Sequence, residues 1–220
     1  MNAVLDLVRV LFEPTAVFER VRERPRFLAP FLALALITVV IVVLQLPYTK
    51  AALTAQFAQT PNMTPEQAQA GLKFASVGIV VAPIAYCLFL LLNAFILWVT
   101  VSVLGGEAKY ATLLSVTTYA SITYALLQIV GLIVLTMRGT GSIGSMLDLQ
   151  PAVGLDLLAP DAKGFTLALL RGINPFTLYG LFLTAVGIAV THRASKGTAY
   201  TAASIQVVLA LLLGAALSRG

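Results

Sequence analysis

Charged residues are scarce in this sequence. Asp, Glu, Lys and Arg make up 10% of its 220 residues, where soluble domains carry about 25%. The mean hydropathy is +0.94 and 59% of the residues are hydrophobic. Because the few charges lie in clusters between long uncharged runs, a soluble domain is excluded and a polytopic membrane protein is predicted. The net charge of +5 then indicates attraction to anionic lipid headgroups in the bilayer rather than to nucleic acid.

Residues for catalysis or metal binding are equally rare. The single cysteine, Cys87, lies in an apolar run and the single histidine, His192, ends another. Neither a disulfide nor a catalytic triad can be built from them. "GTGSIG" at 139–144 matches the dinucleotide fingerprint by letter, but no strand precedes it, so a flexible loop is expected. The sequence predicts no enzyme, no cofactor and no metal.

Acidic residues gather in one later segment, where Asp148, Asp156 and Asp161 lie within "SMLDLQPAVGLDLLAPD". Eight residues between the first two match no recognised ligand spacing. We expect these carboxylates to lie on solvated faces of short interfacial turns rather than to bind a metal ion.

The uncharged runs predict an all-α fold with five membrane-spanning helices, since about 20 apolar residues cross a bilayer. We place the spans at about 27–48, 84–104, 110–137, 175–191 and 198–217. Together they form a transmembrane domain over 27–217, preceded by an arm at 1–26. Residues 139–173 form an outer loop with interfacial segments.

Local signals set some helix ends. Asn174 can cap a helix that Pro175 opens. In "MTPEQAQAGLKFASVG", Thr64 is predicted as an N-cap, with Pro65 at the first helical position and Gln67 completing a capping box. Pro83 is expected to divide the long run at 74–106, which leaves 84–104 as its membrane part.

The arm concentrates basic charge directly before the first span, at Arg20, Arg22, Arg24 and Arg26. By the positive-inside effect, this cluster predicts a cytoplasmic N-terminus in a cell inner membrane. Five spans then place the C-terminus outside. No secretory signal is expected, because the run that follows is of full spanning length.

Two short amphipathic helices are predicted within the arm. Asp6, Arg9 and Glu13 form one polar stripe on an otherwise apolar helix, which is typical of helices that lie in the membrane interface. A proline hinge then starts a second helix, whose apolar face is expected to meet the membrane surface or a protein partner. The candidate interface residues of the arm are Pro14, Val17, Phe18, Val21, Arg24 and Pro25.

The phrase "LFEPTAVFERVRERPRFLAP", followed by five spans, resembles the Yip family, whose members are named for binding Ypt/Rab-type small GTPases. "GGEAKYATLLSVTTYASI" at 105–122 and "NPF" at 174–176 fit the same family. The resemblance implies a five-span integral membrane protein of the bacterial branch. The acidic-aromatic signature of the eukaryotic cytoplasmic domain is absent and the arm is short, so small-GTPase binding is not carried over.

The predicted spans contain no Asp, Glu, Lys, Arg or His, which disfavours transport coupled to an intramembrane carboxylate. Neutral polar residues remain: Asn93 on the second span, and a stripe on the third made of Thr117, Ser121, Tyr124 and Gln128. Thr112, Ser115, Tyr119 and Thr123 fall on the opposite side. We expect hydrogen bonds between helices at these positions and a central place for the third span.

Two classes of function remain. The first is a non-enzymatic scaffold that organises the membrane or binds a protein partner through the arm. The second is a small permease or channel that uses the polar stripes. Five spans do not divide into two equal repeats, so a pathway would have to be built by a homo-oligomer.

Overall fold

All the regular secondary structure in the described part of the chain is helical. The computed structural model describes residues 3–217 and contains no strand in that part. Within it, five helical stretches are long and apolar enough to cross a membrane. They are Leu28–Ala58, Gly78–Val103, Tyr110–Arg138, Pro175–His192 and Lys196–Ala216. The predicted all-α fold with five candidate spans is confirmed.

The helices form two compact units, each built from several chain segments. Unit 1 consists of Met1–Leu34, Cys87–Tyr124 and Ala152–Gly220. Unit 2 consists of Ala35–Tyr86 and Ala125–Pro151. Three helices contribute to both units: α3 (Leu28–Ala58), α5 (Gly78–Val103) and α7 (Ile122–Arg138).

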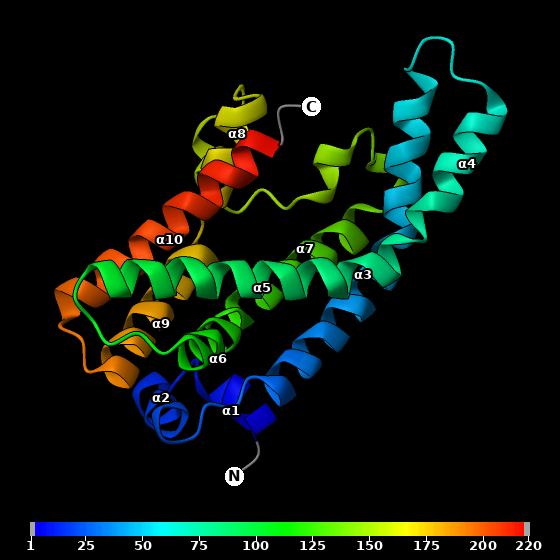
Figure 1. The fold of residues 1–220 in the computed structure, drawn as a ribbon. Coiled ribbons are helices and arrows are strands. Elements are labelled where there is room, and N and C mark those ends of the chain that lie inside the picture. Colours follow the sequence, from blue (N-terminus) through cyan, green and yellow to red (C-terminus); the bar gives the residue numbers. More distant parts are fainter. Residues whose placement is uncertain (1–2, 218–220) are drawn as a thin grey trace. The chain divides into compact units, whose positions relative to one another are not determined.

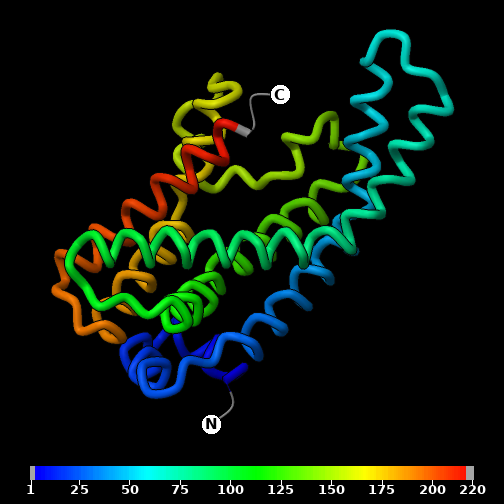
Figure 2. The backbone as a smooth tube through the Cα atoms, viewed as in Figure 1, coloured from blue at the N-terminus to red at the C-terminus, as the bar shows by residue number. Residues whose placement is uncertain are grey.

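Helix α9 (Pro175–His192) is the centre of unit 1. It packs against α2 (Pro14–Glu23), α6 (Tyr110–Ala120) and α10 (Lys196–Leu217), as Figure 1 shows. Helix α10 also contacts α8 (Gly164–Gly172), and in Figure 2 a short connection turns the trace from α9 into α10 beside it. Small side chains let such helices approach closely. The core of this unit consists of Leu97, Val101, Leu113, Ala185, Ile188, Ala199, Ala202 and Ala203.

The residues Asn174, Pro175 and Thr177 determine where α9 begins. Asn174 is in the extended conformation, and its side chain accepts a hydrogen bond of 3.0 Å from the backbone N–H of Thr177. Pro175 occupies the first helical position, where its missing N–H costs nothing. The predicted cap is confirmed.

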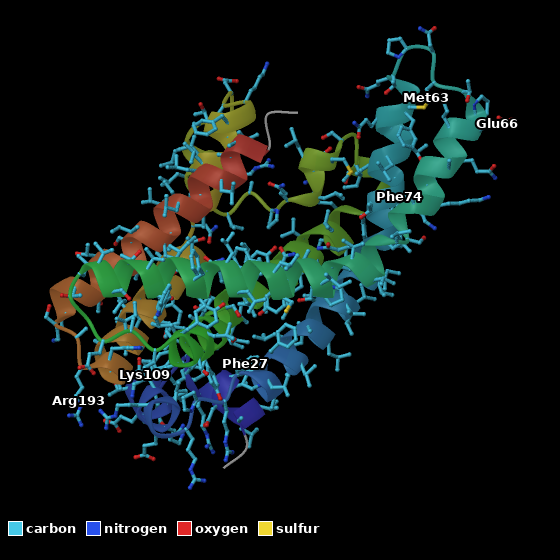
Figure 3. All side chains as sticks on the ribbon, in the orientation of Figure 1. Phe27, Met63, Glu66, Phe74, Lys109 and Arg193 are labelled. Carbon is cyan, nitrogen blue, oxygen red and sulfur yellow. The ribbon has the colours of Figure 1, made fainter. Side chains whose placement is uncertain are left out.

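Unit 2 contains the hairpin of α3 and α4 (Pro65–Ala75). Figure 3 shows Met63 and Glu66 at the connection and Phe74 near the end of α4. The predicted capping box is present: Thr64 accepts from the Gln67 N–H at 3.2 Å, and the Gln67 side chain accepts from the Thr64 N–H at 3.0 Å. Nearby in this unit, Ala52, Leu135 and Ile143 are buried together.

Two helix boundaries differ from the sequence prediction. Pro83 does not divide its run, because α5 continues through it from Gly78. A proline this close to the start of a helix removes a single hydrogen bond, and the break lies instead just after α4. The stretch 110–138 is interrupted at Ser121, between α6 and α7, where the Ser121 hydroxyl donates to the Thr118 carbonyl at 2.8 Å.

Candidate functional site

The arm of unit 1 consists of two helices, α1 (Ala3–Arg9) and α2, separated before Pro14 as predicted. The apolar face of α2 is completely covered: Val17 and Phe18 are 0% exposed and Val21 is 3% exposed. These side chains point toward α9 and α6, where an added methyl at Gly187 would touch the Phe18 ring at 3.2 Å. The prediction that Val17, Phe18 and Val21 meet the membrane surface or a partner is therefore wrong.

Burial of this face holds the arm to the spans. Covering three large apolar side chains contributes on the order of 5 kcal/mol in total. The hydroxyl of Tyr179 on α9 adds a hydrogen bond to the Leu11 carbonyl in the turn between α1 and α2. Of the other predicted interface residues, Pro14 is half-buried at the start of α2, whereas Arg24 and Pro25 are exposed after its end.

The sequence predicted that Asp6 lies on an exposed polar stripe, and this prediction is wrong. Asp6 is buried, and its two carboxylate oxygens accept from Arg20 Nε at 3.2 Å and Arg20 Nη2 at 2.7 Å. This fork is the strong geometry for an arginine and a carboxylate. Arg9 Nη1 approaches the same carboxylate at 3.6 Å. The ion pair ties α1 to α2 and turns the polar side of α1 inward.

The opposite side of α1 is apolar and uncovered. Val4, Leu5 and Val8 are exposed, and Phe12 in the following turn is 79% exposed. Turn hydrogen bonds such as Val10 N–H to the Asp6 carbonyl continue the helical path beyond α1, so these positions share one face. Figure 3 places Phe27 in this part of unit 1, directly before the first span.

A pocket of about 310 Å³ lies between α1, α2, the linker to α3 and α6. Its charged and polar lining residues are Asp6, Arg20, Glu23, Arg24, Arg26 and Tyr119. Tyr119 is almost fully buried in α6 and donates its hydroxyl to the Ala3 carbonyl at 3.3 Å. Sequence reasoning treated the arginines as one anchor and did not find that three of them share a pocket with two acidic residues.

Three serine and threonine hydroxyls of the third span, Tyr110–Arg138, bond to carbonyls of that same span. Thr117 donates to the Leu113 carbonyl at 3.0 Å and Ser115 donates to the Ala111 carbonyl at 3.0 Å. Thr123 donates to the Ala120 carbonyl at 3.1 Å. The expected hydrogen bonds between helices are therefore not made by these hydroxyls. Thr112 through Ala120 are all buried, which agrees with a central place for α6 within unit 1.

The other two members of the predicted stripe are less enclosed. Tyr124 is 45% exposed, with its ring 6.3 Å from that of Phe89, and Gln128 is half-buried. The stripe of Thr117, Ser121, Tyr124 and Gln128 therefore does not line one continuous buried surface.

Asn93 forms a side-chain contact between two spans. Asn93 on α5 is buried and donates Nδ2 to the Phe89 carbonyl at 2.7 Å. Its Oδ1 accepts from Gln206 Nε2 of α10 at 2.7 Å. The Gln206 Oε1 atom is buried without a hydrogen-bond partner. Sequence analysis found Asn93 but missed Gln206, although it is the one long polar side chain in its apolar run.

The acidic residues of 139–173 are not all solvated. Asp156 is buried and accepts from Arg171 Nε at 3.2 Å. Asp148 accepts from the N–H groups of Gly144 and Ser145 at 3.0 and 2.8 Å. Burial opposes ionisation of Asp148, but these hydrogen bonds and Arg138 outweigh it and lower its pKa. Among the described residues, no cluster of three His, Cys, Asp or Glu could hold a metal ion.

Three chain segments meet at the end of unit 1 that carries the arm. The Lys109 N–H donates to His192 Nε2 at 3.2 Å, which joins the α5–α6 connection to the end of α9. Arg22 on the arm donates to the Val190 carbonyl at 3.5 Å. Figure 3 shows Lys109 and Arg193 at this end. Basic residues before the first span, after α5 and after α9 are thus gathered together.

Comparison with known proteins agrees with this architecture. The Yip1 domain profile matches residues 8–218. Membrane protein YknW of Bacillus subtilis (strain 168) is 28% identical over 219 residues, which cover 95% of this chain and 90% of the relative. No solved structure matches the chain significantly.

Proposed function

Because the chain belongs to the Yip1 domain family, as its opening phrase and its five spans predicted, we propose that this multi-pass membrane protein is a non-enzymatic scaffold. It organises the cytoplasmic surface of a cell inner membrane through its N-terminal arm. The observation that carries the proposal is the different use of the two arm helices: α2 is packed against the spans, whereas the apolar face of α1 is left uncovered.

The uncovered face suits a membrane surface. A helix with one apolar face lies in the interface with that face buried about 5–10 Å below the headgroups. Leu5, Val8 and Phe12 offer such a face. Because α2 packs against α9 and α6 and ends at Glu23, shortly before α3 begins at Leu28, we propose that α1 stays at the level where the apolar part of α3 begins. A wedge held there would change the packing of one leaflet.

The orientation follows from the distribution of basic residues. Four arginines precede the first span, and Lys109 and Arg193 lie at the same end of unit 1. Positive charge next to short connections favours the cytoplasmic side. We therefore propose that the arm is cytoplasmic and, with five spans, that the C-terminus lies outside.

A permease or channel is less well supported. A polar pathway needs side chains that offer free hydrogen-bonding groups to the solute, but Thr117, Ser115 and Thr123 bond to carbonyls of their own span. The Asn93–Gln206 contact is a single buried pair. No continuous row of polar groups is present in the described part of unit 1.

A single tryptophan can test where α1 lies. The chain has one tryptophan, Trp98, so Trp98→Phe gives a silent background in which Phe12→Trp becomes the only reporter. In bilayers with lipids brominated near the headgroup, we expect strong quenching of its fluorescence. Glu19→Trp is the matched control, because Glu19 is on the exposed polar side of α2.

The organising activity needs a second measurement. Reconstitution of the wild type at high density should change vesicle diameter, and Phe12→Ser should reduce that change without altering insertion. If Phe12→Trp were quenched no more than Glu19→Trp, the face would be covered by something other than lipid. A photo-crosslinker at position 12 that captured one protein in native membranes would then replace the membrane role by a partner-binding one.

A further inference from the structure

We propose that the pocket between α1, α2 and α6 is a binding site for the phosphate group of an anionic ligand. The proposal rests on the proposed function in one respect only, namely that the arm lies at the membrane surface. It adds a ligand class and a defined place for that ligand. The phosphate could belong to a phospholipid headgroup or to a free phosphate ion, and the experiment below separates these sources.

The charges of the pocket favour an anion. Arg20 is committed to Asp6 through two hydrogen bonds, so that this pair is neutral and satisfied. Arg24 and Arg26 then stand against Glu23 alone, which leaves an excess of one positive charge. Within residues 3–217, the guanidinium groups of Arg24 and Arg26 form no ion pair. They are therefore available to a ligand.

The arginine side chains of the pocket also have a geometry that suits a phosphate group. A guanidinium presents parallel N–H donors in a plane and binds two oxygens of a phosphate at once. Arginine is more weakly hydrated than lysine, so less hydration is lost when it enters a partly enclosed site. All four basic residues of this stretch are arginine, and the two uncommitted ones are on the pocket wall.

The position of the pocket matches the headgroup layer. Arg26 precedes the start of α3 at Leu28 by two residues, and Tyr119 belongs to the candidate span Tyr110–Arg138. The pocket is therefore bounded by an apolar span on one side and by the polar arm on the other. Its volume of about 310 Å³ is at the lower end of the range of ligand sites. This is enough for a phosphate with a small polar substituent.

Binding can be measured on the purified full-length protein in neutral detergent, with native mass spectrometry to count bound lipid. The probes are dioctanoyl phosphatidylglycerol, zwitterionic dioctanoyl phosphatidylcholine and inorganic phosphate. We expect one phosphatidylglycerol per chain to be retained in preference to phosphatidylcholine. Arg24→Gln and Arg26→Gln should each weaken it by about fivefold, the effect of one arginine near a lipid phosphate.

Two neighbours provide matched controls. Arg22→Gln removes the same charge from the same helix, but Arg22 lies outside the pocket and donates to Val190, so less than a twofold change is expected. Glu23→Gln removes the opposing charge and should strengthen binding. Arg24 and Arg26 are exposed, so their variants should fold, which unchanged thermal unfolding without lipid would verify.

A free phosphate ion and a phospholipid headgroup give different expected results in this experiment. If inorganic phosphate stabilises the protein against heat as much as phosphatidylglycerol does, and Arg26→Gln weakens both effects, the ligand is a free phosphate. If only phosphatidylglycerol acts, it is a lipid. Equal losses in Arg22→Gln and Arg24→Gln, or equal retention of phosphatidylcholine, would overturn the site. Quenching of Phe12→Trp by brominated lipid does not depend on either arginine, so failure here leaves the membrane role of α1 standing.

Discussion

The Asn93–Gln206 contact allows a quantitative test of how α5 and α10 are held together. Its four side-chain polar atoms are unequal: Asn93 Oδ1 and Gln206 Nε2 bond to each other at 2.7 Å and Asn93 Nδ2 bonds to the Phe89 carbonyl, whereas Gln206 Oε1 is buried with no partner. Hydrogen bonds between membrane helices contribute about 0.6 kcal/mol on average and up to about 1.7. A buried polar atom left without a partner costs about 1–3 kcal/mol.

The two single variants should therefore differ. Asn93→Leu leaves both ends of the Gln206 amide without a bond, and we expect it to lower the free energy of unfolding by about 2–3 kcal/mol. Gln206→Leu also breaks the bond, but it replaces one orphaned oxygen, Oε1, by another, Asn93 Oδ1. Its cost should be limited to the bond itself, about 1 kcal/mol.

The double variant removes every polar atom of the contact. Replacing both partners by apolar groups of similar shape can be neutral or stabilising, and here it also removes the orphaned Gln206 Oε1. We expect Asn93→Leu/Gln206→Leu to be at least as stable as the wild type, within about 0.5 kcal/mol, and more stable than either single variant.

Unfolding in mixed micelles of increasing sodium dodecyl sulfate content, followed by helical circular dichroism, measures these differences. Thr117→Val is the control, because the Thr117 hydroxyl bonds only to its own helix at Leu113, and its effect should be small. If the double variant lost as much stability as the two single variants combined, the residues would act independently. The contact would then have no energetic meaning.

Three further predictions concern other parts of the chain. Gly187→Leu should release α2 from α9, because any side chain there overlaps α6 and the arm, and faster backbone amide exchange in α2 would report it. Asp148→Asn should remove a pH-dependent protection of the Gly144 amide. The pKa of Asp148 is lowered in the folded chain, so its stabilising effect is present above pH 3.8 and is lost as pH falls below that value. Amide exchange at Gly144 across this pH range measures it. In a Cys87→Ser background, an impermeant maleimide should label a cysteine at Gln150 from outside and one at Ser195 only from inside, and the reverse pattern would contradict the proposed orientation.

Helix ends that depend on neighbouring residues could be predicted from sequence. The caps at Thr64 and Asn174 act across three residues, so their chemistry is complete within a short phrase. Span number was predictable for the same reason, because length and apolar content are local properties. Pro83 was misread because a proline breaks a helix only where the lost bond and the steric clash are not accommodated, and α5 continues through it.

What a face packs against could not be predicted in this way. Periodicity showed that Val17, Phe18 and Val21 share an apolar face, but lipid, a partner and α9 are equally apolar as coverings. The deciding feature, the absence of a side chain at Gly187 on α9, is 169 residues from Phe18 in the chain. The pairing of Asp6 with Arg20 is of the same kind, because it requires that α1 fold back on α2.

The arm shows why one pattern can serve two purposes in a membrane protein. An apolar face on a surface helix must be covered, and α2 is covered by the protein itself, which fixes its position relative to the spans. Once α2 is fixed, the Asp6–Arg20 ion pair fixes α1, and the apolar face of α1 is then directed away from both. A flexible tether could not hold Phe12 and the arginine pocket in fixed positions relative to each other, whereas the packing of α2 and the Asp6–Arg20 ion pair do so. The covered helix is therefore the structural part of the arm, and the uncovered helix, with the pocket beside it, is the part that we propose meets the membrane.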